Sequence, residues 1–134
     1  MNTKTIGDIA VANVMATLVG KGKTILIPWG DNERYDLVID QKEEGFLRVQ
    51  CKNGRARNGT VTFSTTSTQT GKNGILVQDY SADEIDAFGV YCALLGKVYI
   101  VPLKDAGKGE TRLRLEPTKN NQEKNIRWAK DYEI

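Results

Sequence analysis

The chain has 134 residues, of which 40% are hydrophobic and 27% are charged, with a net charge of +2; this is typical of one globular domain, which we expect to span residues 1–134. The sequence has no apolar run of about 18 residues and no secretory signal, which predicts a cytoplasmic protein without a membrane partner. With no histidine and only Cys51 and Cys92, a zinc site is nearly excluded and a disulfide is not expected, so any metal must be held by oxygen.

The first predicted element is a helix over residues 5–18. Its apolar residues recur with the i, i+3, i+4, i+7 spacing of one buried helix face: Val11, Val14, Met15 and Leu18. Thr5 and Asp8 match a capping box, in which Asp8 would bond back to the backbone at Thr5. Gly20 and Gly22 would end the helix.

Three apolar runs follow the helix and predict strands over residues 23–27, 34–41 and 45–52. A short loop separates the last two, so we expect them to pair as a hairpin. Because side chains alternate faces along a strand, Gln50 and Lys52 on the second of these strands point the same way. The pairing would bring both side chains to Asp36, near the start of the first strand.

The rest of the chain predicts more strands and little helix. Runs of β-forming residues predict strands at residues 60–66, 88–94, 97–101 and 111–115. A break rich in Gly and Asn lies at 71–74, a short helix is expected to begin at 81–84, and residues 125–132 are helical or irregular. This order predicts an α/β fold with a mixed central sheet.

Asp36, Gln50 and Lys52 together suit one kind of chemistry. A carboxylate and a neutral oxygen can hold a hard divalent cation, and a neighbouring lysine can orient a nucleophile or stabilise charge on a phosphate. This set favours metal-assisted phosphodiester cleavage. Other interpretations stay open at this point, with Asp36 facing water at a sheet edge, Gln50 an ordinary strand amide and Lys52 a surface lysine.

A basic stretch follows the second of these strands. Residues 51–70 contain no acidic residue, and they are rich in Thr, Ser and Asn. Arg55 and Arg57 within the stretch and Lys72 just beyond it are therefore candidates for contacts with DNA phosphates. The alternative is a solvated loop with an exposed strand.

Asp36 followed by Gln50-Cys51-Lys52 resembles the signature of PD-(D/E)XK nucleases, in the variant where glutamine replaces the second acid. The likeness continues through stretches in the same order at residues 4–10, 27–32, 85–91, 112–115 and 126–133. Together they are similar to the small PD-(D/E)XK homing endonucleases carried by bacterial group I introns. The resemblance implies a restriction-endonuclease-like α/β core, with a mixed central β-sheet flanked by helices.

The same resemblance implies a Mg²⁺-dependent endonuclease that hydrolyses phosphodiester bonds in double-stranded DNA, as a sequence-specific homing endonuclease does. Asp36, Gln50 and Lys52 would be catalytic, and Asp36, Gln50 and the backbone carbonyl of Cys51 would hold the metal. One subunit of this size would cut one strand, so double-strand cleavage predicts a homodimer or a homotetramer.

One position departs from the family pattern. The first helix of the family usually carries a glutamate that completes the metal shell, and the matching residue here is Val11. Asp8, one turn earlier, would either substitute for that glutamate or cap the helix. A DNA-binding protein with weakened or no nuclease activity is therefore an alternative, and so is a Holliday-junction or repair-type nuclease with the same fold.

Overall fold

The structure, a computed structural model, describes residues 1–117, 120 and 125–134. Most strands form one sheet around a long central strand, β3 (Phe46–Arg57). The other strands of this sheet are β1 (Thr24–Leu26), β2 (Leu37–Asp40), β4 (Thr60–Ser64), β7 (Ala87–Cys92), β8 (Lys97–Pro102) and β9 (Glu110–Arg114). β7 runs parallel to β3 and the other pairings are antiparallel, so the predicted mixed sheet is confirmed.

The partners of β3 change along its length. β2 pairs with its first part, as far as Val49, and β4 pairs with its end, from Arg55 onward. β7 pairs with the opposite edge from Val49 to Gly54. Residues 50–54 of β3 therefore have a strand partner on one edge only, within the described chain, and this is where Gln50 and Lys52 lie.

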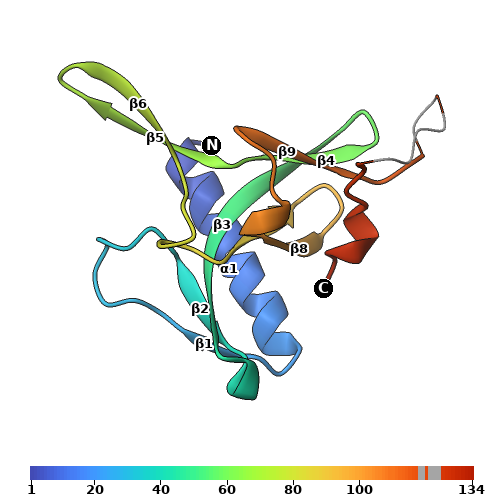
Figure 1. The fold of residues 1–134 in the computed structure, drawn as a ribbon, viewed down its shortest axis with the longest axis horizontal. Coiled ribbons are helices and arrows are strands. Elements are labelled where there is room, and N and C mark those ends of the chain that lie inside the picture. Colours follow the sequence, from blue (N-terminus) through green and yellow to red (C-terminus); the bar gives the residue numbers. More distant parts are fainter. Residues whose placement is uncertain (118–119, 121–124) are drawn as a thin grey trace.

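The helix α1 (Thr3–Gly20) covers one face of this sheet and crosses behind β3 in Figure 1. Its buried residues are Ala10, Val14 and Leu18, which confirms the expected apolar face. Gly89 of β7 allows the close approach, because a Cβ there would lie 2.9 Å from Val49 Cγ1 and 3.1 Å from Val14 Cγ1.

The expected capping box is wrong. The helix begins two residues earlier than predicted, and the side chain of Asn2 accepts the backbone N–H of Thr5 at 2.8 Å. Asp8 lies inside the helix and meets Lys4 at 3.5 Å on its exposed surface. Asn and Thr are both favourable N-cap residues. Asn2 rather than Thr5 caps the helix because residues 3 and 4 also adopt helical geometry.

The expectation of flanking helices is corrected to one α-helix among the described residues. The predicted helix start at 81–84 is a single turn, in which Glu84 N–H donates to Ser81 O at 2.9 Å and Ile85 is already buried. The remaining helical segments are short 3₁₀ turns, namely η1 (Lys42–Glu44), η2 (Leu103–Asp105) and η3 (Ala129–Asp131). The segment 125–132 was predicted to be helical or irregular, and η3 within it confirms this prediction.

Two strands stand apart from the main sheet. β5 (Thr66–Gly71) and β6 (Gly74–Asp79) form a two-stranded ribbon that projects away from the body of the molecule (Figure 1). The predicted break at 71–74 is its turn, where Gly74 has a φ of 104°. Neither strand of the ribbon was predicted. The strand expected at 60–66 is β4, which ends at Ser64, and the short apolar run of β6 has no neighbouring signal that distinguishes a strand from a loop.

Two clusters of buried residues hold the fold together, one under α1 and one around Phe63, Phe88 and Tyr99. Cys51 and Cys92 are both buried, as expected, and both are free cysteines. No helix of the described chain is long and apolar enough to cross a membrane.

Candidate active site

Asp36 lies immediately before β2 rather than inside a strand, which corrects the predicted start of that strand. Its backbone N–H donates to Val49 O at 2.9 Å, and its Oδ2 accepts the backbone N–H of Cys51 at 2.9 Å. The carboxylate therefore satisfies an N–H on the edge of β3 that β2 and β4 leave without a strand partner. Burial raises the pKa of Asp36, while the Cys51 N–H and the charge of Lys52 lower it and the charge of Asp8 raises it.

The Gln50 side chain is in direct contact with Asp36. With its nitrogen turned inward, the amide donates to the carbonyl oxygen of Arg34 and, at 3.3 Å, to Asp36 Oδ2. With its oxygen turned inward, the amide oxygen, the carboxylate and the Arg34 carbonyl would meet as three acceptors. A cation between them, or a proton on the Asp36 carboxyl, would stabilise that second arrangement.

The donor atoms of Asp36 and Gln50 fit a Mg²⁺ ion. Two ligand oxygens about 2.1 Å from Mg²⁺ and at right angles are about 3 Å apart, close to the 3.3 Å between the Gln50 amide and Asp36 Oδ2. The described residues contain no cluster of three or more His, Cys, Asp and Glu side chains suited to a metal. Mg²⁺ usually keeps several waters and binds through one or two carboxylates together with phosphate, so a sparse protein shell suits it.

Lys52 shares a face of β3 with Gln50, as the strand period predicts. Its Nζ donates to the carbonyl oxygen of Thr66 at 2.8 Å and lies 4.9 Å from the centre of the Tyr80 ring. The three predicted residues are thus neighbours, with Asp36 and Gln50 in contact and the amine of Lys52 bonded to the first residue of the ribbon.

The remaining metal-site candidates lie close by in different environments. Val11 is half-buried on α1 and packs against the apolar cluster that contains Leu37, Val49 and Cys51. Asp8, one turn away, is exposed, yet its charge acts on the carboxyl of Asp36. The Cys51 thiol is buried, and burial raises its pKa, so the thiol stays protonated.

Arg34 is a site residue that sequence reasoning missed. Its guanidinium donates to Asp79 O at 2.6 Å, to Glu84 Oε1 at 2.9 Å and to Ser67 Oγ at 2.5 Å. It also lies 3.9 Å from the centre of the Tyr80 ring. Arg34 therefore joins the base of the ribbon to the backbone that contacts Gln50. Its side-chain partners lie 33 to 50 residues away, so no local pattern could have revealed this role.

A second ion pair fixes the strands beside the site. Arg48 of β3 meets both carboxylate oxygens of Asp86 at 3.0 Å, and this guanidinium lowers the pKa of Asp86. Asp86 also accepts the backbone N–H of Arg48 at 2.8 Å. These contacts support β3 and β7 and do not reach Asp36.

The predicted DNA-binding residues lie at two separate places. Arg55 pairs with Glu110 at 3.2 Å, whereas Arg57 lines a hollow of about 380 Å³ whose other charged residues are Glu110, Arg112 and Arg114. Lys72 lies at the turn of the ribbon. The chain therefore presents a basic surface at the end of β3 and a further positive charge at the ribbon tip.

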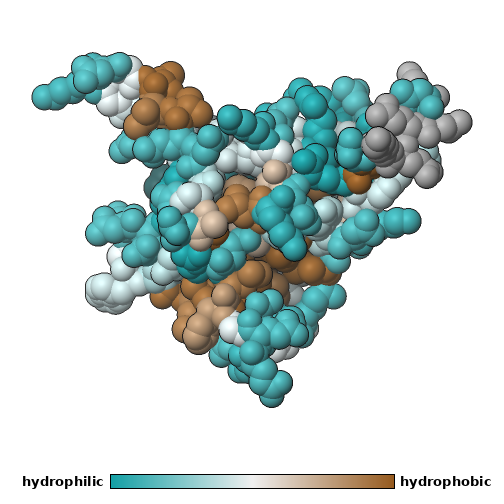
Figure 2. Space-filling model, viewed as in Figure 1, coloured by the Kyte–Doolittle hydropathy of each residue, from teal (hydrophilic) through white to brown (hydrophobic). Residues whose placement is uncertain are grey.

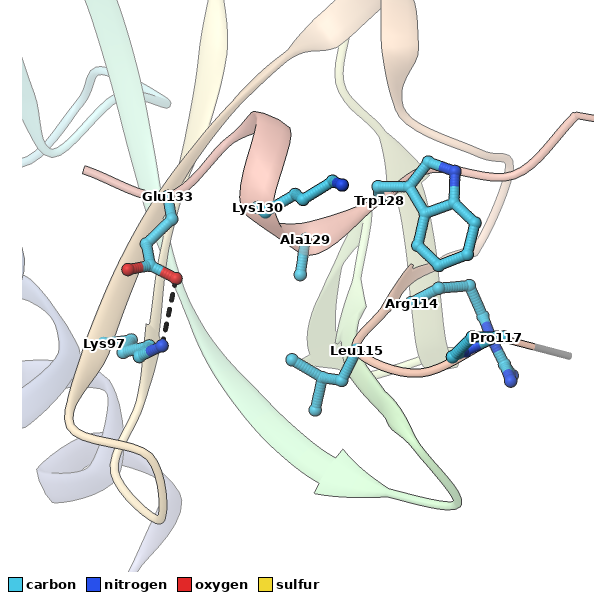
Figure 3. A pocket seen from close by; sticks show the side chains of 8 residues that line it. All are labelled: Lys97, Arg114, Leu115, Pro117, Trp128, Ala129, Lys130 and Glu133. Atoms are coloured by element: carbon cyan, nitrogen blue, oxygen red, sulfur yellow. Dashed lines mark ion pairs between the residues drawn. The ribbon is translucent and has the colours of Figure 1, made fainter. Parts of the chain in front are cut away.

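A larger hollow, of about 530 Å³, is elsewhere, and none of the predicted site residues lines it. Figure 3 shows Trp128, Leu115 and Arg114 on one side of it and the Lys97–Glu133 ion pair, 3.1 Å long, on the other. The hollow lies between the C-terminal segment and the strands β8 and β9.

Comparisons with known proteins bear on the fold and on the family of the chain. Among solved structures, the chain is similar to that of a bacterial homing endonuclease, I-Ssp6803I, with 28% identity and a TM-score of 0.74 over 99% of this chain and 89% of that chain. No curated protein matches the chain. A sequence model of PD-(D/E)XK endonucleases matches residues 1–134. The resemblance drawn from Asp36 and Gln50-Cys51-Lys52 is thereby confirmed, and the chain belongs to the PD-(D/E)XK endonuclease family.

Proposed function

We propose that this protein is a Mg²⁺-dependent endonuclease that hydrolyses phosphodiester bonds in double-stranded DNA at the site of Asp36, Gln50 and Lys52. The observation that carries the proposal is the contact between the Gln50 amide and Asp36 Oδ2 beside Lys52. Membership of an endonuclease family supplies the reaction class.

Asp36 and Gln50 would hold the ion through their side-chain oxygens, with the backbone carbonyl of Cys51 as the further ligand that the family pattern implies. A bound Mg²⁺ would polarise the scissile phosphate and acidify a water molecule. For Gln50 to take this role, its amide turns so that the oxygen rather than the nitrogen faces Asp36 Oδ2. The Cys51 N–H holds the carboxylate in place during that change.

Lys52 acts on the phosphate and on the attacking water. The ammonium group of Lys52 has three N–H donors, and one of them is bonded to the carbonyl oxygen of Thr66 in this structure. When a DNA phosphate lies beside Asp36, Lys52 orients the water and offsets the negative charge that develops on the phosphoryl oxygens. Arg55, Arg57 and Lys72 hold backbone phosphates on either side.

The solved relative is described as a bacterial homing endonuclease, and we propose the same class of sequence-specific cleavage here. One site of this kind cuts one strand, so cleavage of both strands at one target requires two copies related by symmetry. The active species is accordingly a homodimer or a homotetramer.

Plasmid cleavage tests the proposal. The purified protein is expected to nick or linearise supercoiled plasmid in Mg²⁺ but not in EDTA, and Lys52→Ala is expected to lose this activity. Lys21→Ala, which changes an exposed lysine just after α1, is the matched control and keeps it. Equal cleavage by Lys52→Ala and wild-type protein would refute the proposed site.

One observation favours a second candidate function. Val11 packs into an apolar cluster at the position where the resemblance to the family implies a glutamate. The chain without that acid would bind DNA and cut it slowly or not at all. Metal-independent, salt-sensitive DNA binding with no detectable cleavage would identify this case.

A further inference from the structure

The two faces of the ribbon differ in chemistry. Cross-strand partners point to the same face of a two-stranded sheet, and neighbours along a strand point to opposite faces. One face carries Gln69 opposite Leu76, with Gln78 next along β6; we call these three residues the glutamine face. The other face carries only β-branched residues at the matching positions, with Thr68 opposite Val77 and Thr70 opposite Ile75.

The glutamine face is open to solvent. Leu76 is 52% exposed although it is a large apolar residue, and Gln69 and Gln78 are also exposed. Figure 2 shows an apolar patch on the projecting ribbon, to which Leu76 contributes from the glutamine face and Ile75 and Val77 from the opposite face. Neither glutamine amide is hydrogen-bonded to another residue of the described chain, so their donors and acceptors are free for a ligand.

The base of the ribbon is fixed to the candidate active site. Arg34 binds Ser67 and Asp79, one on each strand, and Lys52 binds the carbonyl oxygen of Thr66. The ribbon is therefore a direct extension of the residues that would hold the scissile phosphate. A duplex bound at Asp36 would therefore pass the base of the ribbon.

The major groove of B-DNA, about 12 Å wide, admits a two-stranded β-ribbon. A glutamine amide can bond N6 and N7 of adenine together, and an apolar side chain can contact the methyl group of thymine. An A·T pair presents both features side by side in that groove. Gln69 and Leu76, directly opposite each other, present the matching amide and apolar group. Lys72 at the turn is placed to contact a phosphate.

We propose that the glutamine face of the β5–β6 ribbon enters the major groove and reads A·T base pairs next to the scissile phosphate. Gln69 and Gln78 bond adenine, and Leu76 contacts the thymine methyl. This inference rests on the proposed action on double-stranded DNA and adds the surface and the bases that give it specificity.

Selection from a random double-stranded DNA library, read out by binding without added metal, tests the inference. Wild-type protein is expected to enrich sites with fixed A·T pairs. Gln69→Ala and Gln78→Ala should each lose discrimination at one such position by about 5- to 150-fold, the range of one bidentate contact. The matched control for Gln69→Ala is Thr70→Ala, its neighbour on the opposite face, which should keep the wild-type preference.

Replacement of thymine by uracil in the enriched site tests Leu76 separately, because uracil lacks only the methyl group. Wild-type protein and the control Val77→Ala should bind the uracil site more weakly than the thymine site. Leu76→Ala should bind both sites equally.

Three outcomes would overturn the inference. The first is an unchanged base preference in the Gln69, Gln78 and Leu76 variants, and the second is no enriched sequence for wild-type protein. The third is a change of oligomeric state in these variants by sedimentation, which would assign the face to contact between copies of the chain. The plasmid assay with Lys52→Ala judges the nuclease function independently of all three.

Discussion

The backbone N–H of Cys51 donates to Oδ2 of Asp36 at 2.9 Å, although 15 positions separate the two residues. The N–H lies on the edge of β3 where no strand of the described chain pairs, so the Asp36 carboxylate takes the place of a strand partner there. The bond also fixes one carboxylate oxygen beside the Gln50 amide. It stabilises the ionised carboxylate, but burial opposes ionisation more strongly, so the pKa of Asp36 is raised. A half-buried carboxylate that costs stability when charged is suited to binding a cation.

Metal binding should therefore stabilise the folded protein through Asp36. Mg²⁺ at 100 times its dissociation constant is expected to raise the free energy of unfolding by about 2.7 kcal/mol. Asp36→Asn should show little of this gain in thermal unfolding, whereas the exposed control Asp31→Asn should keep it. An equal gain in Asp36→Asn and wild-type protein would place the metal elsewhere.

The stability of the metal-free protein should depend on pH with opposite signs at two carboxyls. The folded pKa of Asp36 is raised, so its contribution is fully present below the ordinary value of 3.8 and is lost as pH rises through the folded pKa. The folded pKa of Asp86 is lowered by Arg48, so its contribution is present above 3.8 and is lost as pH falls.

Chemical denaturation of wild-type protein, Asp36→Asn and Asp86→Asn across this range separates the two contributions. The stability of wild-type protein relative to Asp36→Asn should fall as pH rises from about 4, and its stability relative to Asp86→Asn should rise. Parallel curves for both pairs would contradict the assigned environments.

Arg34 should control how firmly the ribbon is held. A lysine cannot reproduce the fork that reaches Ser67, Asp79 and Glu84 together, so Arg34→Lys loses part of this contact. Loss of about 2 kcal/mol of local stability would speed amide hydrogen exchange in β5 and β6 about 30-fold.

The control for this measurement is Arg55→Lys, which changes an exposed arginine paired with Glu110. Its ribbon amides should exchange at the wild-type rate. Unchanged exchange in Arg34→Lys would mean that other contacts at the base, such as Lys52 to Thr66, hold the ribbon alone.

The sequence predicted the parts of the site that depend on strand period. Gln50 and Lys52 share a face because they are two residues apart on β3, and β2 follows Asp36 in the expected antiparallel pairing. The sequence did not predict the Arg34 contacts, because they depend on where a ribbon more than 30 residues later leaves the body. The short helix start expected at 81–84 is a single turn, because the Ser81–Glu84 turn is followed directly by buried Ile85.

Val11→Glu tests whether the missing acid limits the site. The substitution places a carboxylate at a half-buried position among apolar side chains, so without metal it should lower the free energy of unfolding by about 1–3 kcal/mol. With Mg²⁺ the new carboxylate becomes a ligand next to Asp36, and both the metal-dependent gain in stability and the rate of plasmid cleavage should rise above wild type.

Val11→Gln is the matched control for this substitution, because it has nearly the same shape without the charge. It should destabilise the metal-free protein and show the wild-type response to Mg²⁺. If both variants respond to Mg²⁺ alike, the charge at position 11 does not act on the metal. The residual activity of the chain would then be set by Asp36, Gln50 and Lys52 alone.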